Sequence, residues 1–490
     1  MALEEIRKIK INKVERLRKN GAEPYPALVE RTHTIAEAKD DFENLQNSGE
    51  TITIVGRVVS RREHGGSIFI NLIDGGGEFQ TYLKKDIVGE AVFQSFIDFA
   101  DVGDFLEVSG KPFTTKKGEP TLEINSLRII SKAILPMPEK WHGLKDVEER
   151  FRKRYLDLIF NKDVRTSFEL RTKIIVAVRN YFIDHGFMEV ETPILQPLAG
   201  GALARPFKTH MNDLDLDLYL RVAPELYLKR LLVGGFERVF EIGKDFRNEG
   251  MDREHNPEFT MLEAYAAYRD YNWMMDFIES LFRKVVKEVF DTEKIETEKG
   301  EINFGQPFPR RTFNDLLKEH AGVDYDEISE ADLKIKAADL GIKVEDKMSK
   351  GLVADEIYKK VARPGIIQPT FIINHPLDIS PLAKKMPTNP SHVERFQLLL
   401  GAMEVANAFS ELNDPIDQRE RFATQEKNRD RGDEEAHRMD NDFIEALEYG
   451  MPPAAGVGIG IDRLVTLLTG AHTLREIILF PTMKPVKIEE

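Results

Sequence analysis

Residues 238–268 read RVFEIGKDFRNEGMDREHNPEFTMLEAYAAY, two strand-like runs (about Arg238–Arg247 and Glu258–Tyr268) around a charged loop. Side chains alternate between the faces of a strand, so one face of the second run carries Phe259, Met261, Glu263 and Tyr265. The other face carries Thr260, Leu262, Ala264 and Ala266. A buried carboxylate costs free energy unless it has a partner. The stretch therefore predicts a hairpin that is either a solvated surface element or a site with a cation-binding Glu263 beside an anion-binding Arg247.

The motifs of this hairpin are FRNEG at residues 246–250 and RxHxPEFTMLE at residues 253–263. They resemble motif 2 of the class II aminoacyl-tRNA synthetases and, in detail, the bacterial type of the lysyl-tRNA synthetase family. The resemblance continues over nearly the whole chain. It implies an α+β fold, with an N-terminal five-stranded OB-type β-barrel followed by a class II catalytic domain, an antiparallel sheet flanked by helices.

The resemblance also implies roles for the residues of the hairpin. Arg247 is expected to hold the lysine carboxylate and the α-phosphate of ATP, and to act in catalysis. Glu249 and His255 are expected beside the adenine and the phosphates, with Phe259 stacked on the adenine. Glu263 and Tyr265 are expected to bind the ammonium group of lysine.

Upstream of the hairpin, residues 198–236 contain PLAGGALARPF and a helix that begins at Glu225 after Ala-Pro. A glutamate in the first turn of a helix often only complements the helix dipole. The family resemblance instead implies that Glu225 contacts an amino group of lysine and that Gly201 offers its carbonyl. Residues 166–197, a long helix and then a strand, resemble motif 1, which implies a homodimer.

Downstream, residues 394–415 read ERFQLLLGAMEVANAFSELNDP and resemble the next active-site hairpin. If Leu400 and Gly401 form a two-residue turn, Gln397 faces Glu404 across the strands. In the family two carboxylates hold Mg²⁺ on ATP at this place, but an amide at Gln397 adds no charge. The expected metal ligands are therefore Glu404 and Gln397, with Glu411.

Asn407 and Glu411 are four residues apart and are expected to share a strand face as lysine ligands. Glu404 has the opposite parity, so it can serve the same site only if a bulge or strong twist intervenes. Beyond them, AGVGIGIDRLVTLLTG at residues 455–470 resembles motif 3, a Gly-rich strand that leads into a helix near Ile461. A helix N-terminus favours phosphate, and the resemblance implies that Arg463 binds the γ-phosphate and acts in catalysis.

Residues 51–135 contain about five short alternating strands between Gly-rich turns, a pattern typical of an OB-type barrel. Such barrels bind single-stranded nucleic acid by stacking bases on aromatic side chains. Spacing alone leaves Phe69 open to a place in the barrel core. The resemblance implies that Phe69 stacks on an anticodon base of tRNA(Lys) and that Arg61, Gln80 and Glu119 hydrogen-bond to bases.

We expect three parts: residues 1–140 with an N-terminal helix and the anticodon-binding barrel, a linker at 141–165, and a catalytic domain at 166–490. A polar region near 310–365 is expected to be a helical insertion. Residues 1–20 read as a basic amphipathic helix, which is expected to pack on its own domain, to contact RNA, or to do both.

The composition narrows the class of protein. A chain of 490 residues is too long for one small core, and 41% hydrophobic with 31% charged residues is typical of a soluble globular protein. No apolar run approaches the roughly 20 residues needed to cross a bilayer, and the first residues lack the apolar core of a signal peptide. The chain has no cysteine, which excludes disulfides and thiolate zinc sites. We expect a cytoplasmic protein without membrane association. The net charge of −15 disfavours binding of RNA by overall attraction, so RNA contacts are expected only at local basic patches.

The function implied by the resemblance is ATP-dependent activation of L-lysine to lysyl-adenylate, followed by transfer of lysine to the 3′ end of tRNA(Lys). The carboxylates Glu263 and Glu411 would repel aspartate, which favours lysine over the substrates of sibling enzymes. Three alternatives stay open: a sibling synthetase, an enzyme that lysylates a protein, and a catalytically inactive RNA-binding protein.

Overall fold

The computed structural model describes residues 2–138, 146–202, 204–345, 347–430 and 438–485. The chain divides into two compact units, residues 1–143 and 144–490. Among the helices of the described residues, none is both long and apolar enough to cross a membrane.

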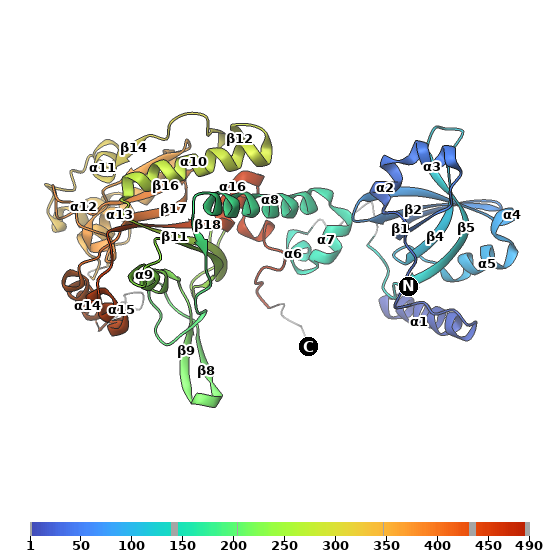
Figure 1. Cartoon of the computed structure of the whole chain (residues 1–490), viewed down its shortest axis with the longest axis horizontal. Coiled ribbons are helices and arrows are strands. Elements are labelled where there is room, and N and C mark those ends of the chain that lie inside the picture. The colour runs from blue at the N-terminus through green and yellow to red at the C-terminus, as the bar shows by residue number, and fades with distance from the viewer. Residues whose placement is uncertain (1, 139–145, 203, 346, 431–437, 486–490) are drawn as a thin grey trace. The chain divides into compact units, whose positions relative to one another are not determined.

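The first unit is built around a closed five-stranded barrel with the strand order β1-β2-β3-β5-β4 (Figure 1). The strands are β1 (Ile52–His64), β2 (Ser67–Asp74), β3 (Gly77–Lys84), β4 (Phe105–Thr114) and β5 (Pro120–Ser131). Helices α2 (Ile35–Asp40), α3 (Phe42–Ser48), α4 (Lys85–Val88) and α5 (Glu90–Phe99) accompany them. Ile68, Ile70 and Leu72 fill the barrel core, whereas Phe69 between them is half-buried. The predicted OB-type barrel is thus confirmed.

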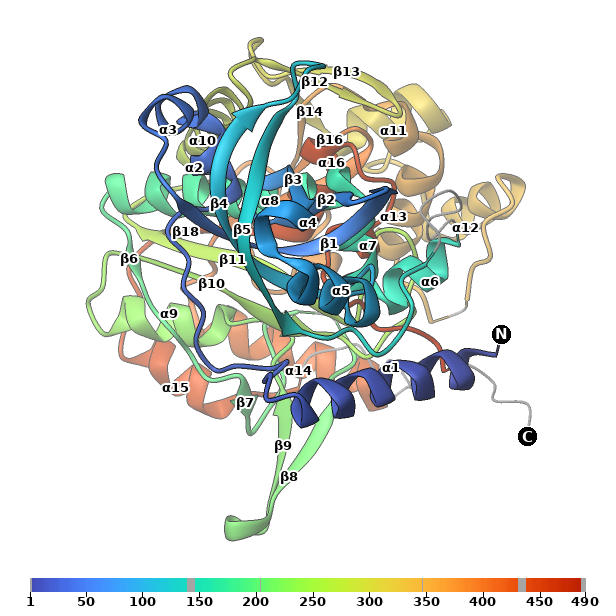
Figure 2. The ribbon, with the colours of Figure 1, turned by 90° about the vertical axis from the view of Figure 1, so that its right-hand side faces the viewer.

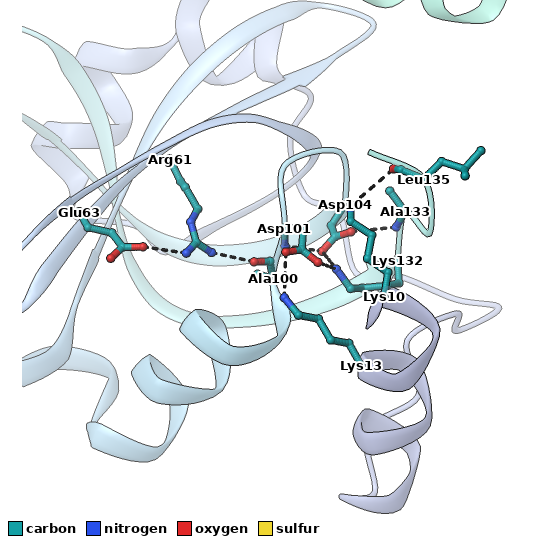
Figure 3. Close-up of polar contacts among 10 residues, drawn as sticks. All are labelled: Lys10, Lys13, Arg61, Glu63, Ala100, Asp101, Asp104, Lys132, Ala133 and Leu135. Carbon is teal, nitrogen blue, oxygen red and sulfur yellow. Dashed lines mark hydrogen bonds and ion pairs between the residues drawn. The ribbon is translucent and has the colours of Figure 1, made fainter. Parts of the chain in front are cut away.

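Helix α1 (Leu3–Lys19) packs on the barrel partly through its basic side chains (Figure 3). The ammonium of Lys13 lies 2.9 Å from the carboxylate of Asp101. Behind it, the buried Lys132 pairs with Asp101 and with Asp104, the latter at 2.7 Å. Of the two roles that the sequence left open for this helix, packing on its own domain is confirmed.

The second unit contains an eight-stranded sheet in the order β14-β15-β16-β17-β18-β11-β10-β6. Its strands are β6 (Met188–Glu189), β10 (Arg238–Phe246), β11 (Glu258–Ala267), β14 (Arg310–Thr312), β15 (Thr370–Ile373), β16 (Arg395–Leu400), β17 (Met403–Ser410) and β18 (Ala454–Gly460). All neighbours are antiparallel except the two edge pairs, β6 with β10 and β14 with β15. The expected hairpin around the charged loop is β10–β11.

Helices cover both faces of this sheet (Figure 1). On one face α8 (Lys162–Asp184), α10 (Tyr271–Phe290) and α16 (Ile461–Thr469) bury their apolar sides in the largest core. On the other face α9 (Glu225–Val233), α14 (Pro415–Asp430) and α15 (Asn441–Glu448) form a second cluster. Leu262 of β11 points into the first cluster and Tyr265 into the second, so the predicted alternation of this strand is confirmed.

The rest of the second unit surrounds the sheet. Helices α11 (Phe313–Ala321), α12 (Glu330–Asp339) and α13 (Lys350–Val361) share a core with Ile372 and Leu399 of the sheet. The segment assigned to a linker contributes α6 (Val147–Arg152), α7 (Arg154–Phe160) and the start of α8, and its residues 141–145 lie outside the described residues. Small sheets are formed by β7 (Leu195–Gln196), β8 (Lys208–Met211) and β9 (Leu216–Leu220), and by β12 (Lys294–Thr297) with β13 (Gly300–Asn303). Figure 2 shows the β8–β9 hairpin extending away from the rest of this unit.

Candidate active site

The pocket-facing side of β11 is kept open by glycines on its neighbour β18. Glu263 pairs with Gly458 and Tyr265 with Gly456. A Cβ atom at Gly456 would fall 2.1 Å from Oε1 of Glu411 and 2.4 Å from the Tyr265 ring. The glycines of the predicted motif 3 therefore leave room on this face for acidic and aromatic side chains, which a larger residue would displace.

One cavity brings together the six residues expected at the nucleotide. It is lined by Arg247, Glu249, His255, Phe259, Glu404 and Arg463, which come from β10–β11, its loop, β17 and α16. The Arg247 guanidinium lies 5.0 Å from the centroid of the Phe259 ring. The cavity thus combines two arginines with an aromatic face, a pairing suited to a polyphosphate attached to a planar base.

Arg463 is held in the first turn of α16, as predicted. Its Nη1 donates to the carbonyl of Glu404 at 3.0 Å, and its Nη2 lies 2.9 Å from Nε2 of His255. A guanidinium can only donate, so this Nε2 accepts and the proton of His255 is on Nδ1, which faces Asp252 at 2.8 Å. The contacts orient both side chains at the mouth of the nucleotide cavity.

The hairpin β16–β17 differs from the prediction in its turn. Gly401 and Ala402, with φ of 57° and 61°, form the turn in place of Leu400 and Gly401. The sequence misled because an alanine seldom adopts positive φ. Gln397 consequently pairs with Asn407 and not with Glu404.

A β-bulge in the same hairpin places Asn407, and not Ala406, opposite Gln397, which stays diagonal to Glu404. The register shifts next to Leu398, so that Leu399 pairs with Glu404 and Val405 is left between the paired residues. Nε2 of Gln397 then donates to Glu404 at 3.2 Å. The bulge also puts Glu404 and Asn407 on one strand face. The sequence required a bulge or a strong twist before these two residues could serve one site, and the bulge is present.

The three expected metal ligands are not brought together. Glu404 lines the nucleotide cavity beside Gln397, whereas Glu411 is buried next to Lys229, behind the other cavity. Among the described residues, no group of three or more His, Cys, Asp or Glu side chains could hold a metal ion by itself. The oxygens of Glu404 and Gln397 fit Mg²⁺ that reaches the site with ATP, because Mg²⁺ usually takes one or two protein carboxylates and completes its shell with phosphates and water.

A second cavity brings together six of the seven expected lysine ligands. Gly201, Glu225, Arg247, Glu263, Tyr265 and Asn407 line it, with Arg395 and Phe409 among the others. The hydroxyl of Tyr265 donates to Oε2 of Glu263 at 3.0 Å. Asn407 is fixed by Arg395, whose Nε donates to its side-chain oxygen at 3.0 Å. The cavity thus presents two carboxylates and a phenol to one small volume.

Burial shifts the titration of this cavity strongly. It raises the pKa of Glu263 well above its usual value, and the neighbouring Asp245 and Glu225 add to the rise. Burial likewise raises the pKa of Asp245 to about 7 although Arg221 opposes it. Burial destabilises the ionised form of such a carboxyl group, and a cationic ligand beside it stabilises that form again.

Lys229, which the sequence did not single out, lies behind this cavity. Its ammonium is 2.5 Å from Oε1 of Glu225 and 2.5 Å from Oε2 of Glu411, and its side chain has no exposed surface. Glu411, the seventh expected lysine ligand, is not a lining residue of the cavity, but its Oε1 lies over Gly456 on the same side as the Tyr265 ring. The signal in the sequence was the spacing of four residues between Glu225 and Lys229 on α9, which puts them on one helix face.

The two cavities meet at Arg247, which lines both. Met261, Asn407 and Gly458 are also shared. Nε of Arg247 is buried and has no hydrogen-bond acceptor among the described residues. A buried donor without a protein partner is costly, so this atom can donate to an anionic ligand at the junction of the two cavities.

In the barrel, a bulge decides which arginine of β1 lies opposite Phe69. A bulge in β1 between Val58 and Ser60 shifts the register, so that Arg62 and not Arg61 pairs with Phe69. Arg61 instead donates to the carbonyl of Ala100 and to Glu63, both at 2.7 Å (Figure 3). The role expected for Arg61, a hydrogen bond to an anticodon base, is not tested by these contacts and stays a prediction.

Phe69 and Gln80 do share one face of the barrel. Phe69 pairs with Tyr82 on β3, with ring centroids 4.8 Å apart, and Gln80 lies two residues before Tyr82. Oε1 of Gln80 accepts from Arg62 at 2.8 Å. Glu119 is exposed in the turn before β5. This face offers half-buried aromatic rings beside polar side chains, which is the surface that stacks and reads unpaired bases.

Comparisons with known proteins match both units. Residues 146–484 match the family model described as tRNA synthetases class II (D, K and N), and residues 52–130 match the model described as OB-fold nucleic acid binding domain. Lysine--tRNA ligase of Pelotomaculum thermopropionicum is 49% identical, over 99% of this chain and 96% of that protein. Lysine--tRNA ligase of Carboxydothermus hydrogenoformans is 49% identical over 99% of both chains.

Proposed function

The chain belongs to the class II tRNA synthetases of the aspartate, lysine and asparagine group, and within it to the lysine--tRNA ligase family, and we propose that the cavities joined at Arg247 are its ATP and lysine sites. The enzyme activates L-lysine with ATP to lysyl-adenylate and transfers the lysine to the 3′ end of tRNA(Lys). The observation that carries the assignment of the sites is the unpartnered Nε of Arg247 at the junction of the cavities. In the first step the lysine carboxylate attacks the α-phosphate, and both anions meet at this junction.

The proposed mechanism is one of positioning and charge neutralisation. Attack of a carboxylate on the α-phosphate requires no proton transfer, so no general base is needed. Arg247 holds the carboxylate and the α-phosphate in line, which places the reacting atoms and offsets the charge of the transition state. Arg463 binds the γ-phosphate, Glu249 and His255 border the adenine and the phosphate tail, and Phe259 supports the adenine.

Lysine is selected by its ammonium group. The group must leave water, so it requires carboxylates that are already in place. Glu263 and Tyr265 receive the side-chain ammonium, while Glu225 and the Gly201 carbonyl receive the α-amino group. Glu411 acts from behind the cavity, and Asn407, which lines both cavities, orients the substrate between them.

Amino-acid-dependent exchange of pyrophosphate into ATP tests the assignment. We expect lysine to support exchange and aspartate and asparagine to support none. Exchange with aspartate or asparagine alone would indicate a sibling enzyme, and the absence of any exchange would indicate an inactive relative. Lysine-dependent exchange without charging of tRNA(Lys) would indicate another acceptor.

We further propose that Mg²⁺ arrives with ATP and is held by Glu404 with the help of Gln397. When bound, the ion neutralises charge on the phosphates. Because Gln397 contributes no charge, we predict that Gln397→Glu lowers the Mg²⁺ concentration for half-maximal exchange by about 3- to 10-fold, a difference of about 1 kcal/mol. Magnesium titrations at fixed ATP measure the shift. The same titration with Gln46→Glu, an exposed residue of α3 that does not line the nucleotide cavity, is the control. An unchanged requirement in Gln397→Glu would remove position 397 from the metal site.

We propose that the barrel binds the anticodon through Arg61, Phe69, Gln80 and Glu119, with Arg62 beside Phe69 as a further contact. The contact between Phe69 and Tyr82 and the hydrogen bond between Arg62 and Gln80 support this surface. We predict that Phe69→Ala raises the KM for tRNA(Lys) by roughly 10-fold or more, because stacking of one base contributes about 1–3 kcal/mol. Exchange in the absence of tRNA should stay unchanged. A variant that charges tRNA with an unaltered KM would show that Phe69 does not contact the anticodon.

We also propose that the enzyme is a homodimer and works in the cytoplasm. Five apolar side chains around α8 and the strands that follow, Val176, Ile183, Met188, Ile194 and Leu195, are 43–52% exposed. Val176 and Ile183 are seven residues apart and so lie on one face of α8, and apolar side chains exposed on one helix face are typical of an interface. The absence of cysteine is consistent with a reducing compartment.

A further inference from the structure

Three carboxylates converge on the amino-acid cavity, and two of them share one buried cation. Glu263 and Glu225 line the cavity, and Oε1 of Glu411 lies over Gly456, a residue of the cavity wall. Lys229 sits 2.5 Å from both Glu225 and Glu411 and is sealed from solvent. Its ammonium also lies 5.3 Å from the ring centroid of Phe409, a residue of the cavity wall. A cation so close to a cavity for a cationic substrate, yet outside it, requires an explanation.

The contacts of Glu411 indicate what this cation does. The carboxylate is 1% exposed, and no described residue donates a well-aligned hydrogen bond to either of its oxygens, so its only close partner is the ammonium of Lys229. Its Oε1 is the atom that a side chain at Gly456 would strike, so it faces the cavity wall. Without a cation behind it, this group would be an unpaired buried charge, which costs several kcal/mol.

We propose that Lys229 is a positioning residue of the lysine site: its ammonium holds the carboxylates of Glu225 and Glu411 in place beside the cavity and stabilises their charged forms, which receive the substrate. This role rests on the proposed function of the cavity. The proposed role divides the three acids of the site into two groups. Lys229 contacts Glu225 and Glu411, whereas Glu263 accepts a hydrogen bond from Tyr265 and has no contact with Lys229.

Other titratable and charged groups surround the cluster of Lys229, Glu225 and Glu411. They are Glu263 and Tyr265 on β11, Arg395 on β16 and Arg247 after β10. Burial raises the pKa of Glu225, and raises that of Glu411 to about 8, while Lys229 opposes both rises. Removal of the ammonium must therefore lift both pKa values further. The ionised fraction of both acids at neutral pH would then fall further, and with it their attraction for an ammonium ion.

The test compares Lys229→Met with wild type in pyrophosphate exchange between pH 6.5 and 9. We expect a KM for lysine raised by about 10-fold or more at pH 7, since one unit of pKa is a tenfold change in ionised fraction. The KM for ATP should change less than about twofold, and the deficit for lysine should shrink as pH rises and the acids ionise. Arg230→Met, which removes the next cation of α9 and its contact with Asp440, is the matched control and should leave lysine KM unchanged.

A structural role alone predicts a different pattern. Equal losses for lysine and ATP, or a lysine deficit that does not change with pH, would overturn the proposal, as would a wild-type KM for lysine. If Lys229→Met does not fold, the double variant Lys229→Met/Glu411→Gln removes the cation together with one acid and leaves fewer unpaired charges. It is expected to fold and to retain a raised KM for lysine that recovers with pH through Glu225 alone; a pH-independent KM would contradict the proposal. Wild type without lysine-dependent exchange would contradict the proposed function itself, which is a separate outcome.

Discussion

Replacing Glu263 by Gln is expected to raise the KM for lysine about 30-fold or more, because a buried hydrogen bond to a charged group contributes roughly 2 kcal/mol or more. The substitution keeps the shape of the side chain and its contact with Tyr265, which lies at 3.0 Å. It removes only the charge that receives the ammonium. Steady-state pyrophosphate exchange with varied lysine measures the effect, and the KM for ATP should change little.

Glu258→Gln is the matched control for this prediction. Glu258 begins the same strand but is exposed and does not line either cavity. If Glu263→Gln had the same KM for lysine as wild type, Glu263 would not belong to the lysine site.

The raised pKa of Glu263 adds a dependence on pH to the same experiment. The ionised form binds the ammonium, and burial favours the protonated form, so lysine must displace a proton from the carboxyl group. The KM of wild type for lysine should therefore rise as pH falls. In Glu263→Gln this contribution is absent, and the dependence should become shallower, although Glu225 and Glu411 still titrate.

Replacing Arg247 by Lys is expected to lower kcat by about 100- to 1,000-fold, the usual cost of losing one donor that stabilises the transition state. The substitution keeps the positive charge, but an ammonium cannot form two parallel hydrogen bonds to a carboxylate and a phosphate. Arg247 is the one arginine that lines both cavities among the described residues, so no neighbour replaces its geometry.

Arg253→Lys provides the control for this effect. Arg253 belongs to the same loop, is exposed and does not line either cavity. Single-turnover formation of lysyl-adenylate separates the chemical step from binding. A loss confined to KM in Arg247→Lys would show that Arg247 binds substrate without stabilising the transition state.

The parts of the fold that the sequence predicted are those with strong local patterns. Alternation along β11 predicted correctly that Glu263 and Tyr265 share a face opposite Leu262. The starts of α9 at Glu225 and of α16 at Ile461 followed from helix signals and glycine placement. The five strands of the barrel were predicted in the same way.

The parts that failed depend on single residues that break a pattern. A bulge in β1, which the sequence did not indicate, puts Arg62 opposite Phe69, and the turn of β16–β17 formed one residue later than expected because Ala402 accepts a positive φ. Register changes of one residue carry almost no signal in composition, yet each transfers a side chain to the other face. Lys229 was missed for another reason: a lysine on a helix is usually solvated, and only the tertiary structure shows two acids around it.

The central claim is that lysine and ATP occupy two cavities that meet at Arg247. A crystal structure of the enzyme with a non-hydrolysable analogue of lysyl-adenylate tests it most directly. We predict that the side-chain ammonium lies within hydrogen-bond distance of Glu263 and Tyr265, that the phosphate mimic contacts Arg247, and that the adenine packs on Phe259. An analogue bound with its ammonium away from Glu263, or with no contact to Arg247, would contradict the claim.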